Sequence, residues 1–224
     1  MKIFKTVLLT IIFLFIGNYA AYADQSNNEY KILIDAGHGG FDGGAKSKNG
    51  TIEKGINLSI SLKLRDVLAS KGYKVYMTRE DDISLATGKK DDLHLRCEMK
   101  KETECDLFIS IHQNMFSSQK CKGTQVWYSS NEKSKKLAES IQLAVREQVQ
   151  PENTRVAKDA KKAYKILRDG YDCGSVIVEC GFLSNYDDEK NLQNEEYQRS
   201  IVTAIGNGID KYFEEKPEKK PILN

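Results

Sequence analysis

The 224-residue sequence has only three histidines, and none of its five cysteines forms a Cys-x-x-Cys pair. The missing pair argues against a zinc ribbon, which holds its metal with closely spaced thiolates. The odd number of cysteines excludes complete pairing within the chain. One disulfide remains possible, but free and partly buried thiols are the simpler expectation for a chain of this size. With so few histidines, each can be weighed separately as a ligand or a base.

Long apolar runs are also missing, except near the start of the chain. The run Val7–Ile16 is shorter than the about 20 residues that a transmembrane helix needs. Lysines precede it and Ala21-Tyr22-Ala23 follows it, a pattern typical of a signal peptide and its cleavage site. We therefore expect residues 1–23 to be a signal peptide, or a membrane anchor if it is not cleaved, and the rest of the chain to be exported.

An excess of charge of one sign is missing as well. Residues 1–23 contain two of the 34 lysines and arginines and none of the 32 aspartates and glutamates, so the exported chain would be formally neutral. A neutral balance argues against nucleic acid as a partner, because it provides no bulk electrostatic attraction.

The glycine-rich segment Gly39–Ser47 does not match a nucleotide-binding loop. A phosphate loop needs glycine directly before its lysine, and here Ala45 precedes Lys46. The dinucleotide pattern needs a third glycine where Asp42 stands. We therefore expect no nucleotide cofactor.

The hydrophobic pattern predicts one domain over residues 31–214, between a linker at residues 24–30 and a flexible tail at residues 215–224. Strands that alternate with helices indicate βαβ units. The predicted fold class is α/β, with a central mixed, mostly parallel sheet and helices on both faces. Apolar periodicity places strands at residues 31–35, 74–79, 107–112, 123–129 and 176–179, and helices at residues 56–70, 93–103, 133–149 and 195–213.

Three chemically active residues follow apolar strands. His38 lies in the turn Asp35-Ala36-Gly37-His38-Gly39-Gly40 after the first strand, whereas His112 and Glu179 end two later strands. Functional groups gather at the carboxyl ends of parallel strands, so these three side chains should converge on one rim of the sheet. Catalytic zinc sites use three histidine or carboxylate ligands and keep one position open. For His112 alone, a hydrogen-bonded core histidine is an equally good explanation.

Four segments resemble the motifs of a known family. The segment at residues 35–45 resembles the opening motif of the zinc-dependent N-acetylmuramoyl-L-alanine amidases, which hydrolyse bacterial cell walls. The segments around Glu53, at residues 106–112 and at residues 178–185 resemble the second, third and fourth motifs of that family. Within it, the chain is most similar to the spore-cortex germination amidases.

The resemblance implies a role for each site residue. His38, Glu53 and His112 would bind one Zn²⁺ per chain, and Glu179 would be the catalytic carboxylate. Glu179 would take a proton from the attacking water and return it to the leaving nitrogen as the bond between muramic acid and L-alanine of peptidoglycan is cleaved. Without the resemblance, Glu53 is one of many carboxylates in a lysine-rich loop.

The resemblance leaves the biological setting and two other functions open. It implies action in the cell wall or the forespore intermembrane space. A non-catalytic wall-binding or regulatory relative would keep the fold, and a zinc peptidase would cut within the stem peptide instead. The stretch between His112 and Trp127 has no long acidic insertion of the kind that forms an autoinhibitory helix in some relatives. A separate activating protein is therefore a possible partner.

Other polar residues have more modest predicted roles. Asp35 could orient a ligand histidine, or could hydrogen-bond within its own turn. We expect His94 to be solvated and Cys180 to be a small core residue rather than a nucleophile. The lysines at residues 158–165 could touch an acidic wall polymer, but a solvated helix face is the simpler expectation.

Overall fold

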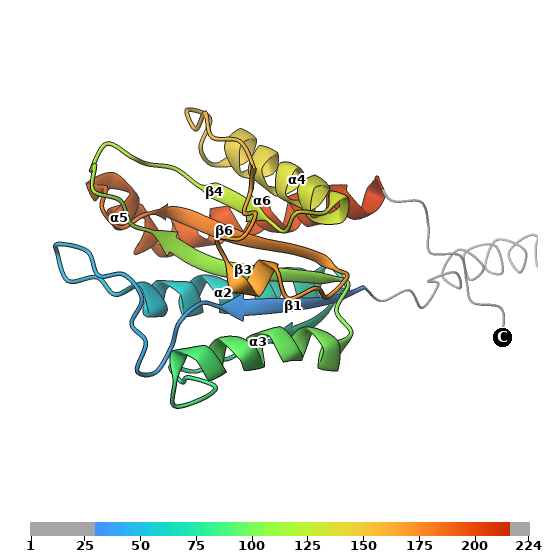
Figure 1. The fold of residues 1–224 in the computed structure, drawn as a ribbon. Helices are drawn as coiled ribbons and strands as arrows, with labels where there is room; N and C mark the ends of the chain where they lie inside the picture. Colours follow the sequence, from blue (N-terminus) through green and yellow to red (C-terminus); the bar gives the residue numbers. More distant parts are fainter. Residues whose placement is uncertain (1–29, 216–224) are drawn as a thin grey trace, which may run out of the picture. The chain divides into compact units, whose positions relative to one another are not determined.

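The computed structural model of the chain describes residues 30–215. The predicted signal peptide and almost all of the predicted linker and tail lie outside these residues. Figure 1 shows the helices and strands of the described part, which forms one compact unit. The strands are β1 (Lys31–Ala36), β2 (Lys74–Met77), β3 (Leu107–Asn114), β4 (Gln125–Tyr128), β5 (Lys158–Asp159) and β6 (Gly174–Phe182). The helices are α2 (Glu53–Ser70), α3 (Lys89–Thr103), α4 (Glu132–Gln148), α5 (Tyr186–Leu192) and α6 (Glu195–Glu214), with a 3₁₀ turn η1 at Lys165–Leu167.

The strands form one mixed sheet in the order β2-β1-β3-β6-β4-β5. β1 pairs in parallel with β2 and β3, β3 pairs in parallel with β6, and β4 pairs in parallel with β5. Only the pair of β4 and β6 is antiparallel within the described sheet. The predicted α/β class and the mostly parallel sheet are confirmed.

Helices cover both faces of the sheet, as predicted. Successive side chains of a strand point to opposite faces, so Ile32 and Ile34 pack under α2, α4 and α6, whereas Leu33 points to the other face. There, Leu33 and Phe108 pack with Cys97 of α3 and with residues 160–173. Figure 1 shows α3 on the opposite side of the sheet from α4 and α6. No helix of the described part is long and apolar enough to cross a membrane.

Two of the strands that carry site residues are longer than predicted. β3 continues to Asn114 and β6 to Phe182, so His112 and Glu179 lie inside their strands rather than at the last residue. Both side chains face the cavity described below, so they are polar although the strand continues. The apolar pattern therefore ends earlier in the sequence than the backbone pairing does. The register becomes irregular between His112 and Asn114, where the strands approach the rim of the sheet.

Other boundaries also differ from the sequence prediction. α2 begins at Glu53, three residues earlier than predicted. α5 was not predicted; it begins where the side chain of Asn185 accepts hydrogen bonds from the next helical N–H groups. The lysines at residues 158–165 do not share one helix face. Lys158 lies in β5 beside β4, Lys161 and Lys162 lie in a turn, and Lys165 begins η1. His94 is exposed on α3, and Cys180 is a fully buried core residue, as predicted.

Candidate active site

The structure brings His38, Glu53 and His112 together at one rim of the sheet. His38 follows β1, His112 lies in β3, and Glu53 is the first residue of α2. One potential ligand atom from each residue lies within 4.8 Å of the others. Glu53 lies between the two imidazoles, with Oε2 3.2 Å from His38 Nε2 and Oε1 2.9 Å from His112 Nδ1. The two rings are 4.9 Å apart and nearly perpendicular. This cluster could hold one metal ion.

The electrostatics of the cluster favour positive charge between these side chains. Burial lowers the pKa of the His38 imidazole, but the carboxylates of Glu53 and Asp42 outweigh it and raise the pKa to about 9. Burial raises the pKa of Glu53, but hydrogen bonds and charge from the two histidines more than reverse this and hold it well below its usual range. Two imidazoles and an ionised carboxylate are a donor set suited to a divalent cation.

Two glycines are required because the chain passes directly against the candidate ligands. A Cβ atom on Gly37 would lie 2.3 Å from Nε2 of His112. Gly44 has a φ of +69°, and a Cβ atom there would lie 2.5 Å from Oε2 of Glu53 and 2.6 Å from Cδ2 of His38. Any larger residue at these positions would have to displace a ligand. The glycines of the opening motif therefore make space for the cluster.

Glu179 lies in β6, beside the cluster of His38, Glu53 and His112. It is directly opposite His112 in the parallel pair of β3 and β6 and is only 7% exposed. Burial raises its pKa to about 7, although the two nearby histidines act to lower it. Its Oε2 atom is buried and has no hydrogen-bond partner in the described part of the chain. Buried carboxylate oxygens are normally paired, so this atom is positioned to accept a hydrogen bond from a bound molecule.

A cavity of about 490 Å³ joins these groups. Its wall includes His38, His112 and Glu179, together with Leu93 and Tyr164. Three donors that could hold a metal ion, next to a buried carboxylate whose pKa is raised, are an arrangement suited to hydrolysis of an amide.

Comparison with known proteins identifies the reaction. The family model described as N-acetylmuramoyl-L-alanine amidase matches residues 32–211. The chain belongs to the N-acetylmuramoyl-L-alanine amidase family. It is an enzyme that hydrolyses the amide bond between the lactyl group of muramic acid and L-alanine of peptidoglycan.

Individual relatives agree with this assignment. The germination-specific N-acetylmuramoyl-L-alanine amidase of Bacillus subtilis is 36% identical over 83% of this chain and 80% of its own length. The CwlD amidase of Clostridioides difficile, solved in complex with the GerS lipoprotein, is 39% identical with a TM-score of 0.79 over 83% of this chain and 99% of that one. An N-acetylmuramoyl-L-alanine amidase of Clostridium difficile 630 is 29% identical with a TM-score of 0.77 over 85% of this chain and all of that one.

Hydrogen bonds around the amidase site orient the candidate ligands. Asp42 Oδ2 lies 2.9 Å from His38 Nδ1, on the side of the ring away from Glu53. Glu53 accepts hydrogen bonds from the backbone N–H groups of Ala45 and Gln113, at 2.8 and 3.1 Å. Such outer partners fix the tautomer and direction of a ligand. Sequence analysis did not single out Asp42 for this role, although its place four residues after His38 in the same motif was the available signal.

Asp35 makes no hydrogen bond to the side chains of His38, Glu53 or His112. The sequence suggests that it orients a ligand histidine or bonds within its own turn, but its hydrogen bonds go to Arg96, Ser110 and Thr78, at 2.6, 2.6 and 2.8 Å. Burial raises the pKa of Asp35, and the Arg96 guanidinium with the Ser110 hydroxyl reverses this to about 2. Asp35 therefore holds Arg96 in place beneath the turn that carries His38.

Two buried arginines fix the backbone of that turn. His38 has a φ of 61°, a left-handed conformation that is unfavourable for a residue with a side chain. Arg79 Nε donates to the carbonyl oxygens of Ala36 and His38, at 2.8 and 2.7 Å. Arg96 Nη2 also donates to the carbonyl oxygen of His38, at 2.8 Å. The two arginines therefore stabilise the strained backbone that directs the His38 imidazole toward Glu53 and His112.

We expect Arg96→Lys to weaken metal binding by about 10- to 100-fold, the range seen when an outer partner of a ligand is lost. Lysine keeps the charge next to Asp35, but a single ammonium group cannot bridge Asp35 and the His38 carbonyl as the planar guanidinium does. Competition with a chromophoric chelator measures the affinity, and thermal unfolding checks that the variant folds. Arg65→Lys, on the outer face of α2, is the matched control. An affinity equal to that of the control would refute the role of Arg96.

Proposed function

We propose that this amidase holds one Zn²⁺ with His38, Glu53 and His112 and uses Glu179 as its general base and acid. The observation that carries the proposal is the cluster of three donors beside a buried carboxylate oxygen that has no partner within the described chain. The donor set supports zinc, since catalytic zinc sites combine histidines with one carboxylate and leave a position open. Bound zinc would lower the pKa of water and polarise the scissile carbonyl.

The residues of the chain then account for the proton movements. Glu179 takes a proton from the attacking water as the new bond to the lactyl carbonyl carbon forms. It gives the proton to the alanine nitrogen as the carbon–nitrogen bond breaks. Burial raises the pKa of this carboxyl group above its ordinary value, which favours both the uptake and the return of the proton. The products are a muramic acid with a free lactyl carboxylate and a stem peptide that begins with L-alanine.

We also propose that the enzyme acts outside the cytoplasm on spore-cortex peptidoglycan, with residues 1–23 as its signal peptide or anchor. The germination-specific relative of B. subtilis supports this setting. The C. difficile relative was solved with a lipoprotein, which supports a separate activating partner for this chain. The proposed catalytic domain over residues 31–214 is followed by the proposed tail from residue 215.

Digestion of purified cortex and vegetative peptidoglycan, followed by mass spectrometry, tests the proposed cleavage and substrate. We expect free stem peptides that begin with L-alanine and glycan strands without peptides, with faster release from cortex. Zinc analysis of the purified protein should find one ion per chain. Peptides cut internally, with the muramoyl–alanine bond intact, would instead indicate a peptidase. Equal release from both walls would contradict the cortex assignment alone.

A further inference from the structure

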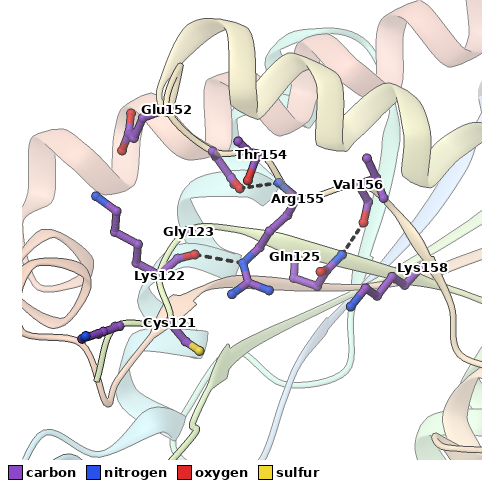
Figure 2. Close-up of a pocket in the computed structure, with 11 residues that line it drawn as sticks. Cys121, Lys122, Gly123, Gln125, Glu152, Thr154, Arg155, Val156 and Lys158 are labelled. Carbon is purple, nitrogen blue, oxygen red and sulfur yellow. Dashed lines mark hydrogen bonds between the residues drawn. The ribbon is translucent and has the colours of Figure 1, made fainter. Parts of the chain in front are cut away.

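A second cavity, of about 500 Å³, lies beside β4 and carries a marked excess of positive charge. Four basic side chains line it, Lys120, Lys122, Arg155 and Lys158, against a single acidic residue, Glu152. Figure 2 shows Arg155 and Lys158 on either side of Gln125 in this cavity. The catalytic mechanism described above uses none of these residues.

The basic cavity begins next to Glu179. Gln125 lines the cavity and is directly opposite Glu179 in the antiparallel pair of β4 and β6. Opposite residues of such a pair direct their side chains to the same face of the sheet. On the other side of Glu179 is His112, its partner in β3. His112, Glu179 and Gln125 therefore form a row across three strands, with the metal cluster at one end and the basic cavity at the other.

The positive charge of the cavity is held in place by neutral groups. Arg155 Nε donates to the carbonyl oxygen of Lys122 at 2.9 Å, and its guanidinium lies 4.6 Å from the centre of the Phe182 ring. Lys158 Nζ lies 5.6 Å from the ring of Trp127. Gln125 Nε2 donates to the carbonyl oxygen of Val156 at 2.6 Å, which fixes the segment that carries both basic residues beside β4.

No carboxylate of the described chain forms an ion pair with any of the four basic side chains. The nearby Asp188 carboxylate is buried and accepts hydrogen bonds from the N–H groups of Gly123 and Phe182. The Nη atoms of Arg155 have no hydrogen-bond partner in the same part of the chain. A guanidinium with free N–H groups, in a cavity that three lysines also line, is suited to bind a carboxylate.

The order of groups along the row indicates which part of the substrate reaches the cavity. This step rests on the proposed function. The scissile carbonyl must lie at the metal cluster, and the leaving alanine nitrogen must lie at Glu179, which returns the proton. The peptide that follows this nitrogen therefore continues away from His112, past Gln125. We infer that the basic cavity is the subsite for the carboxylates of the acidic stem peptide, with Arg155 and Lys158 as its main contacts.

Binding to the Glu179→Gln protein tests this subsite without turnover. Calorimetry would compare the free acidic stem peptide with the same peptide amidated at its carboxylates. We expect Arg155→Gln/Lys158→Gln to weaken binding of the acidic peptide by about tenfold or more, as expected for lost hydrogen bonds to a charged group. Binding of the amidated peptide should not change. The matched control is Lys63→Gln/Arg199→Gln, which removes two cations from a separate hollow between α2 and α6.

Several outcomes would overturn the subsite. The double variant could lose the same affinity for both peptides, or could bind the acidic peptide as tightly as its control does. The Glu179→Gln protein without further substitutions could also fail to bind the acidic peptide. Binding of a glycerol phosphate polymer is measured in the same way. If Arg155 and Lys158 are needed to bind the polymer but not the peptide, the cavity recognises phosphate and the inference is wrong. If the wild-type protein releases stem peptides and the double variant has the same KM as the wild type, the subsite is refuted but the proposed function is not. If the wild-type protein releases no stem peptide, the proposed function is refuted.

Discussion

Glu179→Gln is expected to lower the rate of wall hydrolysis by at least about 10²-fold, because glutamine cannot take up or return a proton. Metal content should not change, since Glu179 is not among the three donors that lie within 4.8 Å of one another. The substitution keeps the shape of the side chain and its place between His112 and Gln125. The rate is measured as stem peptide released, and the metal by elemental analysis of the same sample.

The same variant should not be less stable than the wild-type protein. Burial raises the pKa of Glu179 from 4.5 to about 7 in the folded state. The folded protein therefore binds this proton more tightly than the unfolded chain, and its stability falls as the pH rises from about 4.5 through 7. Glutamine removes this cost. In metal-free protein at pH 8, we expect the Tm of the variant to equal or exceed that of the wild type.

Glu139→Gln, on the exposed face of α4, is the matched control for both measurements. It should leave hydrolysis and Tm unchanged. If Glu179→Gln retained the full rate, another group would have to move the proton. If it lost its metal together with its activity, Glu179 would have to be assigned to metal binding instead.

Simple strand patterns were enough to predict that three of these residues meet. Apolar runs identify β1, β3 and β6, and the helices between them require parallel pairing. Ala36 pairs with Ile111, and His112 pairs with Glu179. The residues at the ends of these three apolar segments therefore lie at the same edge of the sheet. The strand register therefore brings His112 and Glu179 together and places the end of β1 beside them, and the turn after β1 then positions His38.

Glu53 could not be found in this way, because no periodic pattern brings it to the site. Contacts within the loop before α2 bring Glu53 to the site. The Ala45 N–H donates a hydrogen bond to the Glu53 carboxylate, and Gly44 lets the backbone pass close to it. Arg79 and Arg96 were missed for a related reason. Arg79 ends a predicted strand and Arg96 lies in a charged predicted helix, and neither pattern indicates burial. Each is only 3% exposed because it binds the carbonyl groups of the His38 turn.

Glu53→Gln is therefore the sharpest test of the metal centre, since only the resemblance to the family suggested this residue. We expect metal affinity to fall by more than about 10²-fold, beyond the loss caused by removing an outer partner. The neutral amide removes the one negative charge between His38 and His112. The amide NH₂ group is a donor and cannot accept a hydrogen bond. It would replace a carboxylate oxygen that now lies beside His38 Nε2 or His112 Nδ1. Hydrolysis should be lost with the metal.

Thermal unfolding in the presence of zinc gives a measurement of this loss that does not depend on activity. At a zinc concentration of 1,000 Kd, binding stabilises the wild-type protein by about 4 kcal/mol, and a 10²-fold weaker site reduces this to about 1.4 kcal/mol. Zinc should therefore raise the Tm of the wild type and of Glu104→Gln, an exposed control, far more than that of Glu53→Gln. Equal increases would show that Glu53 is not a ligand. The two histidines and a residue outside this cluster would then have to hold the metal.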